Sequence, residues 1–299
     1  MIFRTGRMNL ITANHCDFLT PKNGLVPYYD KFISQYTCIV ITTLVSQCNL
    51  MPEMFSEKES VLDSHIDIFI KKIPENILKQ RGVYRPLLTG MMLKSGDVVQ
   101  ESEDRTFFSD SFIKQAQASE VSSRGLVIRT LNAYAFMNYF FLIEKTLRDV
   151  YLEVTPDKSK SLGGIKTISY CLKRKLKHSE QLQEFEVELK RRSKFFKNFK
   201  SLSTLWKLLN FIRNRQAHYN SAYDLEAQNR LSTFLEDFLE KNSSDELLIV
   251  NVSFGSKFEE IIEGIQDTGQ LVFNDMLENL IRNTSVLVME SLYILETSS

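Results

Sequence analysis

Residues 126–154 read LVIRTLNAYAFMNYFFLIEKTLRDVYLEV, a long run without glycine or proline. Its apolar side chains would lie around most of the circumference of a helix, which is typical of a central, buried helix. Ser122 and Ser123 offer a cap in front of it, and Thr155-Pro156 ends it. The longest purely apolar pieces in it, Ala133–Met137 and Tyr139–Ile143, are far shorter than the roughly 20 residues that span a bilayer. We therefore expect this segment to form the core of a soluble protein.

The rest of the chain also favours helices. Its 299 residues include only 11 Gly and 6 Pro, against 21 Phe and many long side chains. Turn signals and periodicity predict helices over 28–48, 59–80, 165–177, 180–199, 224–240 and 270–296, and one with the apolar stripe Leu205, Leu208, Leu209 and Ile212. The alternating residues of Leu247–Phe254 predict a short strand. We expect a mostly α-helical fold: a helical bundle over 123–299, with a β-containing insertion at about 241–265, after a mixed or helical N-terminal region, 1–122, of unknown role.

Charge is balanced in total but uneven along the chain. Lys and Arg number 37, as do Asp and Glu, so the formal net charge is zero. The protein as a whole is therefore not attracted to nucleic acids or other polyanions. Residues 126–220, however, carry 19 positive and 8 negative side chains, whereas 221–299 carry 4 and 15. The acidic part could neutralise the basic part within one domain or across a dimer. The four cysteines have no CxxC spacing, which favours reduced thiols and a cytoplasmic location.

The positive charge is concentrated in two clusters. The first contains Lys173, Arg174, Lys175 and Lys177; the second contains Lys190, Arg191, Arg192, Lys194, Lys197 and Lys200, with Phe195, Phe196 and Phe199 among them. Interleaved bases and aromatic rings can hold a phosphate backbone and stack on unpaired bases. The alternative is a solvated helix face whose phenylalanines enter the core. We expect Lys173, Arg174, Lys190, Arg191, Arg192 and Lys194 to contact substrate, together with Lys207 and Arg215.

The residues with the clearest chemistry follow the apolar stripe of 205–212. There Arg213 and Asn214 are followed by His218. Histidine titrates near neutral pH and can manage protons, whereas arginine is always charged and can stabilise a phosphorane. Asn214 shares a helix face with His218 and could orient the imidazole or a phosphate oxygen. Arg213 and His218 are about 140° apart around a helix, so either two copies of the motif face each other across a two-fold axis, or the helix frays before His218.

Glu144 lies in the apolar run of the first helix, where an unpaired carboxylate would be costly. Arg213 is its natural partner, and we expect Glu144 to hold the guanidinium without transferring a proton. A structural alternative is that Arg213 only forms an ion pair with Glu144 or with an acidic residue of 224–240, and that His218 only caps carbonyls or packs.

The motif Arg213-Asn214-x3-His218, at the end of an amphipathic helix and after a long apolar helix carrying Glu144, resembles the HEPN superfamily. The resemblance covers roughly 123–296. It implies a HEPN-like helical domain and a metal-independent endoribonuclease without cofactors, in which two motifs meet at a homodimer. It also implies a role in phage defence, including abortive infection, or in a toxin–antitoxin system, with an antitoxin or other defence component as partner. Our hypothesis is thus RNA cleavage by 2′-OH attack; the alternative is a non-catalytic helical module that binds RNA or protein.

Overall fold

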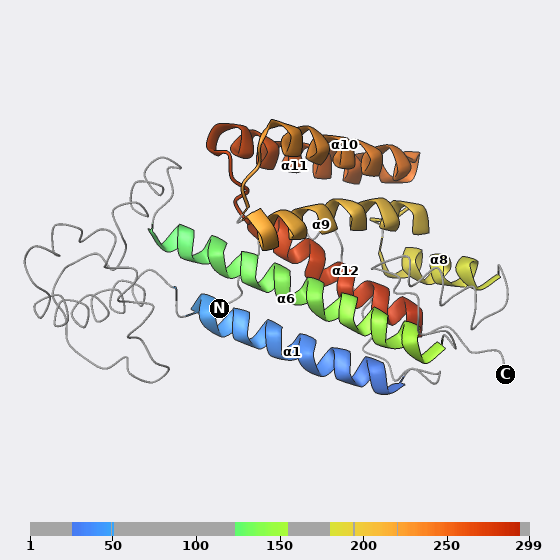
Figure 1. Cartoon of the computed structure of the whole chain (residues 1–299). Coiled ribbons are helices and arrows are strands. Elements are labelled where there is room, and N and C mark those ends of the chain that lie inside the picture. Colours follow the sequence, from blue (N-terminus) through green and yellow to red (C-terminus); the bar gives the residue numbers. More distant parts are fainter. Residues whose placement is uncertain are drawn as a thin grey trace, which may run out of the picture. The chain divides into compact units, whose positions relative to one another are not determined.

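A computed structural model describes residues 26–48, 50, 123–154, 180–193, 195–219 and 221–293. These residues form seven α-helices and one 3-10 helix (Figure 1). The chain divides into two units, one of Met1–Val40 with Asn132–Ser299 and the other of Ile41–Leu131. The following description concerns the first unit, which contains the candidate site. The helices predicted at 59–80 and 165–177 lie outside the described residues, as does most of the predicted N-terminal region.

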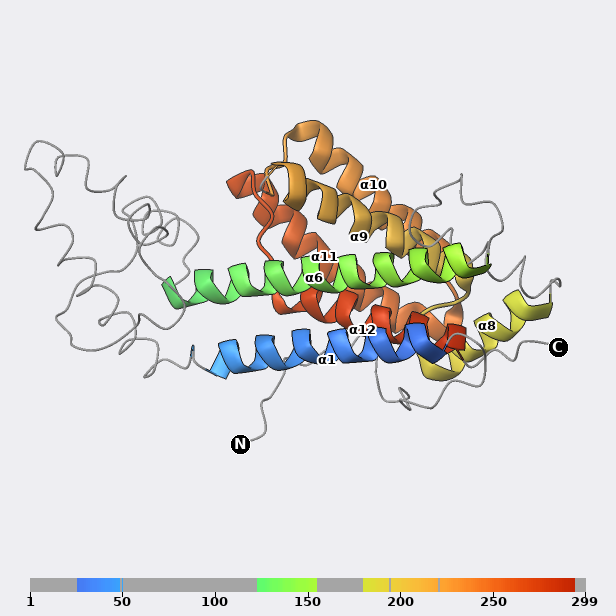
Figure 2. The ribbon, with the colours of Figure 1, turned by 60° about the horizontal axis from the view of Figure 1, so that its bottom comes forward.

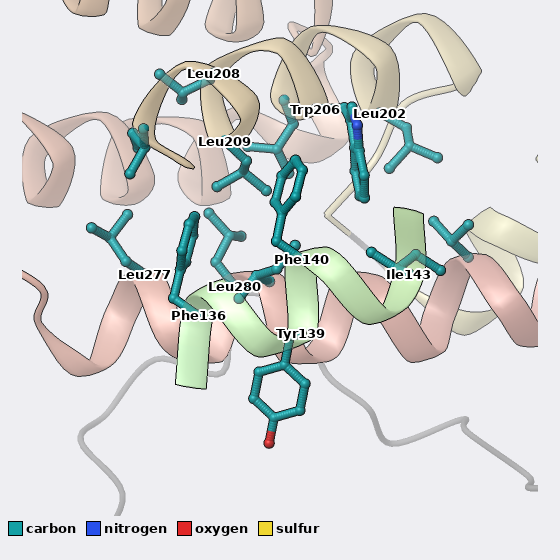
Figure 3. Close-up of a cluster of buried hydrophobic side chains, with 14 of the residues drawn as sticks. Phe136, Tyr139, Phe140, Ile143, Leu202, Trp206, Leu208, Leu209, Leu277 and Leu280 are labelled. Atoms are coloured by element: carbon teal, nitrogen blue, oxygen red, sulfur yellow. The ribbon is translucent and has the colours of Figure 1, made fainter. Parts of the chain in front are cut away.

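The predicted central helix is confirmed as α6 (Ser123–Val154), and residues from Ala133 to Tyr151 contribute much of the core. In Figures 1 and 2, the part of α6 that belongs to the first unit lies between α9 (Phe199–Tyr219) on one side and α1 (Val26–Cys48) on the other. Helix α12 (Asp275–Tyr293) lies alongside. Phe140 stacks on Trp206 of α9 at 4.8 Å between ring centroids. In Figure 3, Phe136 and Phe140 point toward α9, whereas Tyr139 points the opposite way. The helix is thus buried on two sides.

The opposite side of α6 packs against the N-terminal part of α1. Tyr139 lies 5.3 Å from Tyr36 between ring centroids, and Phe32 is fully buried. Aromatic pairs at such distances add to the stabilisation that burial provides. Residues 26–40 therefore belong to the same unit as the bundle, which the predicted boundary near residue 122 did not anticipate.

A second set of helices covers α9. Helices α10 (Leu225–Lys241) and α11 (Leu248–Thr268) form the outer layer in Figure 1. Helix α10 begins at Asp224, whose carboxylate accepts a hydrogen bond from the Ala227 amide at 2.8 Å, as an N-cap does. Gly255 favours the close approach of α10 and α11, because a Cβ there would lie 3.2 Å from Leu239 Cδ1, which would have to shift by a few tenths of an ångström. The predicted helix over 224–240 is thus confirmed.

The strand predicted over Leu247–Phe254 is wrong. Leu247 ends a 3-10 helix, η2 (Asp245–Leu247), and the rest forms the first turns of α11. The buried residues here are Leu247, Asn251, Phe254, Gly255 and Phe258, which follow the helical period. Phe254 packs against Phe238 of α10 at 5.2 Å between centroids. Tertiary packing therefore overrides the alternation of β-favouring residues, and the predicted insertion at 241–265 is η2 with α11.

Two further boundaries differ from the sequence prediction. The helix expected over 180–199 is shorter in the structure, where α8 (Glu180–Arg192) ends at Arg192. Helix α9 begins at Phe199, because Asn198 caps it by accepting a hydrogen bond from the Ser201 amide at 3.0 Å. The last helix begins at Asp275, after Asn274 accepts from the Leu277 amide at 3.2 Å. Each cap thus fixes where the following helix, α9 or α12, begins.

A buried amide network joins these elements. Asn242, at the end of α10, donates to the Phe195 carbonyl at 2.7 Å and to Asn251 Oδ1 at 2.9 Å, and it accepts from the Lys197 amide at 2.9 Å. Because Asn242, Phe195 and Asn251 are buried, the network holds the α8–α9 connection against α10 and α11. Among the described residues no helix is sufficiently long and apolar to cross a membrane.

Candidate functional site

The candidate site lies in the C-terminal half of α9. One side of this helix is buried along its length, through Leu202, Leu205, Leu208, Leu209 and Ile212 among others. This confirms the stripe predicted from the sequence, and it fixes the rotation of the helix against α6. The residues that follow Ile212 are therefore held at a defined place beside α6.

Arg213 pairs with Glu144 of α6. Its Nη2 donates to Glu144 Oε2 at 2.8 Å, and both side chains are about four-fifths buried or slightly less. The guanidinium carbon also lies over the rings of Phe140, at 5.1 Å, and Phe141, at 5.8 Å. The predicted partnership of Glu144 and Arg213 is confirmed. Two aromatic faces and one carboxylate thus hold the guanidinium in place.

Burial raises the pKa of Glu144 above its ordinary value, whereas the charges of Arg213 and Arg148 and the hydrogen bond from Arg213 act to lower it. The carboxylate thus depends on its arginine partner, because desolvation alone would favour the protonated form. Arg213 has a donor left: its Nε is buried without a hydrogen-bond partner among the described residues.

Asn214 and His218 complete the motif on the same helix. Helix α9 continues to Tyr219, so it does not fray before His218. His218 is exposed and Asn214 is half-buried, and neither side chain is hydrogen-bonded to a described residue. With the helix intact, Arg213 and His218 point about 140° apart in one chain. The fraying before His218 that the sequence analysis considered is therefore not seen in α9.

Arg215 has a local structural role. Its guanidinium donates to the Ala222 carbonyl through two nitrogens, Nε at 2.8 Å, and lies 4.3 Å from the centre of the Tyr219 ring. This holds the turn between α9 and α10, where Ser221 adopts a left-handed φ of 61°. Ala222 and Gln270 form an isolated antiparallel bridge there. The guanidinium of Arg215 is thus hydrogen-bonded within the protein, whereas the side chain of Lys207 is exposed to solvent.

The second basic cluster separates into two kinds of residue. Lys190 and Arg191 of α8 are exposed. Arg192 is instead fully buried, where it pairs with Glu290 of α12 and with Glu188 at 3.3 Å. Since nothing can reach this side chain from solvent, Arg192 leaves the set of candidate substrate contacts. Lys173, Arg174 and Lys194 lie outside the described residues.

Two phenylalanines of this cluster, Phe195 and Phe196, enter the core, as the alternative interpretation of the charge run stated. Phe195 and Phe196 are buried, and Phe195 stacks on Phe238 at 5.6 Å between centroids. They are therefore not available to stack on nucleic-acid bases.

Two buried glutamates, Glu278 and Glu290, are not among the residues predicted from the sequence. Glu290 accepts from Arg192 and from the Tyr29 hydroxyl at 3.3 Å, and Glu278 lies 3.1 Å from Arg282 Nε. Glu290 follows the apolar run Val286–Met289, the same signal that identified Glu144. That signal could have predicted both a buried carboxylate and the need for a basic partner.

Comparison of the chain with models of protein families, with curated proteins and with solved structures gives no match.

Proposed function

We propose that this protein is a metal-independent endoribonuclease of the HEPN type, which acts as a homodimer. The observation that carries the proposal is the guanidinium of Arg213, held by Glu144 at 2.8 Å, on the same helix as an exposed His218. Phosphodiester cleavage by an internal hydroxyl requires a fixed cation and a proton-exchanging imidazole, and the motif supplies one of each.

The reaction begins with attack of the ribose 2′-oxygen on the adjacent phosphorus. The new O2′–P bond forms as the P–O5′ bond breaks, so the products are a 2′,3′-cyclic phosphate and a 5′-hydroxyl. The 2′-hydroxyl gives up one proton and the 5′-oxygen gains one. His218 serves one of these transfers, as general base or general acid, because an imidazole exchanges protons near neutral pH.

Arg213 stabilises the charge on the phosphorane oxygens. Glu144 takes Nη2 of the guanidinium, and because the side chain stays 19% exposed, the other terminal nitrogen, Nη1, is the donor left for a phosphate oxygen. A preorganised donor of this kind stabilises developing charge without reorganising during the reaction. Glu144 acts as a positioning residue, and Asn214 orients either the imidazole or a phosphate oxygen.

A second subunit would bring the second motif to the same linkage. Arg213 and His218 diverge on one continuous helix, so a single chain does not direct both at one phosphorus. Beside Arg213, α6 exposes Phe141, 48% accessible, and Tyr134 on the same face one heptad earlier. Exposed aromatic side chains of this size often mark subunit interfaces. This face supports a two-fold contact that places the two motifs opposite each other.

The exposed lysine and arginine side chains of α8 and α9, Lys190, Arg191 and Lys207, would guide RNA by attraction to its phosphates. The resemblance further suggests a setting in phage defence or a toxin–antitoxin system, with a partner that restrains the nuclease.

The test compares wild type with His218→Ala, Glu144→Gln and the control Glu236→Ala, which removes an exposed charge from α10. Each protein is incubated with total RNA in EDTA, and the product ends are analysed. The proposal predicts cyclic phosphate ends with wild type and control, and loss of at least about a hundredfold in rate for His218→Ala. Because His218 is exposed, its substitution should leave the helical circular dichroism unchanged. Intact RNA with wild type, or equal cleavage by His218→Ala, would instead favour a non-catalytic binding module.

A further inference from the structure

The outer side of α11 exposes apolar residues that its own core does not use. Ile249 is 84% exposed, Val252 64% and Leu248 61%, although the neighbouring Phe254 and Phe258 are fully buried. With Ser253, Ser256, Lys257 and Glu260, these three residues line an open hollow of about 550 Å³. We call this surface the α11 face. It is one continuous side of the helix, because its residues recur at helical spacing.

The apolar part of the α11 face is followed by acidic residues. The carboxylates of Glu259, Glu260, Glu263 and Asp267 are exposed along the C-terminal half of the same helix, and Asp245 and Glu246 are exposed just before it. Lys257 is the basic residue among them. Salt bridges join none of these six carboxylates to another described residue. The face is therefore apolar at its beginning and negative along the rest.

This arrangement is unfavourable for α11 in isolation. Glu259, Glu263 and Asp267 are four residues apart, and like charges at that spacing destabilise a helix. They also lie toward its C-terminal end, where the last turn contains no basic residue to offset the partial negative charge of the helix dipole. A cationic partner would relieve both repulsions while covering the apolar residues. RNA would not, because its phosphates add negative charge.

We propose that the α11 face docks a basic amphipathic helix of a partner protein. The partner's apolar side chains cover Leu248, Ile249 and Val252, and its lysines and arginines face the carboxylates from Glu259 to Asp267. The face runs for about 28 Å from 248 to 267, which matches a partner helix of about 20 residues. This site is distinct from the proposed ribonuclease motif on α9, and it does not depend on catalytic activity.

The experiment measures binding of a designed helical peptide by isothermal calorimetry. The peptide has about 20 residues, with leucines on two turns of one face, lysines on the following turns of that face, and alanine and glutamine elsewhere. A second peptide carries glutamate in place of lysine. Four proteins are compared, each checked for unchanged circular dichroism and thermal unfolding: wild type, Ile249→Ser with Val252→Ser, Glu260→Lys with Glu263→Lys, and a control. The control, Leu225→Ser with Glu236→Lys, changes an exposed apolar and an exposed acidic residue of α10.

The proposal predicts that wild type and control bind the lysine peptide equally within about twofold. Each α11 variant should bind it at least tenfold more weakly, and the glutamate peptide should not bind. Binding that both α11 variants retain, equal binding of the two peptides, or no binding by wild type would overturn the proposal. So would sedimentation showing that wild type is a dimer and Ile249→Ser with Val252→Ser a monomer, because a second copy would then occupy the face.

Discussion

Removing Glu290 tests the buried ion pair that joins α8 to α12. The Arg192 side chain is fully buried and that of Glu290 is 2% exposed, so Glu290→Ala takes away a buried countercharge. It also removes the acceptor of the Tyr29 hydroxyl, which lies 3.3 Å away. Breaking such a pair costs about 3–5 kcal/mol, because the remaining charge stays desolvated. Since Glu188 still lies 3.3 Å from Arg192, we expect the lower end of this range, about 3 kcal/mol.

The assay is urea unfolding followed by circular dichroism and by the fluorescence of Trp206, the single tryptophan. Trp206 is buried against Phe140, so its emission reports loss of the core. Replacing both partners, Arg192→Met with Glu290→Met, should restore stability to within about 2 kcal/mol of wild type, because an apolar pair needs no countercharge. The exposed control Glu236→Ala should change stability by less than about 0.5 kcal/mol. A loss below about 1 kcal/mol in Glu290→Ala, or a double variant less stable than the single one, would refute the reasoning.

Two more predictions concern the core. Burial raises the pKa of Glu278 to about 7, with Arg282 lowering it and Asp275 raising it. Burial, and after it the charge of Glu278, raises the pKa of Tyr139. The folded state therefore binds the Glu278 proton more tightly than the unfolded chain, whose value is near 4.5. Its contribution, about 3 kcal/mol, is full below pH 4.5 and is lost as the pH rises through 7, so Glu278→Gln should flatten the pH dependence of urea midpoints in that window. Asn242→Ala should cost about 2–3 kcal/mol by urea unfolding, because it leaves buried amide partners unsatisfied; a change below about 1 kcal/mol would contradict the network.

The sequence predicted those parts of the fold whose evidence is local. Apolar residues at helical spacing identified α6, α9 and α10. The pairing of Glu144 with Arg213 was also predictable, because a carboxylate in an apolar run needs a cation and the motif supplies one. The free-energy cost of burying the Glu144 carboxylate without a cation made this pairing predictable.

Other features depended on partners far along the chain. Leu247–Phe254 contains β-favouring residues in alternation, and only packing of Phe254 on α10 favours the helix. Arg192 lies in a run of charges and resembled a surface residue; its burial follows from Glu290, 98 positions away. The turn after α9 depends similarly on Arg215 and the Ala222 carbonyl. Local patterns do not specify such long-range contacts.

The most direct test of the proposed composite site is complementation between two inactive variants. Arg213→Ala and His218→Ala are each assayed alone on RNA and then mixed in equal amounts after subunit exchange. In the composite site, Arg213 of one subunit acts with His218 of the other. After exchange in equal amounts, half of the dimers contain one subunit of each variant, and each of these dimers has one intact site of two. The mixture should therefore recover about a quarter of wild-type cleavage. A mixture that stays as inactive as its components, although exchange is shown by sedimentation, would contradict the two-subunit site.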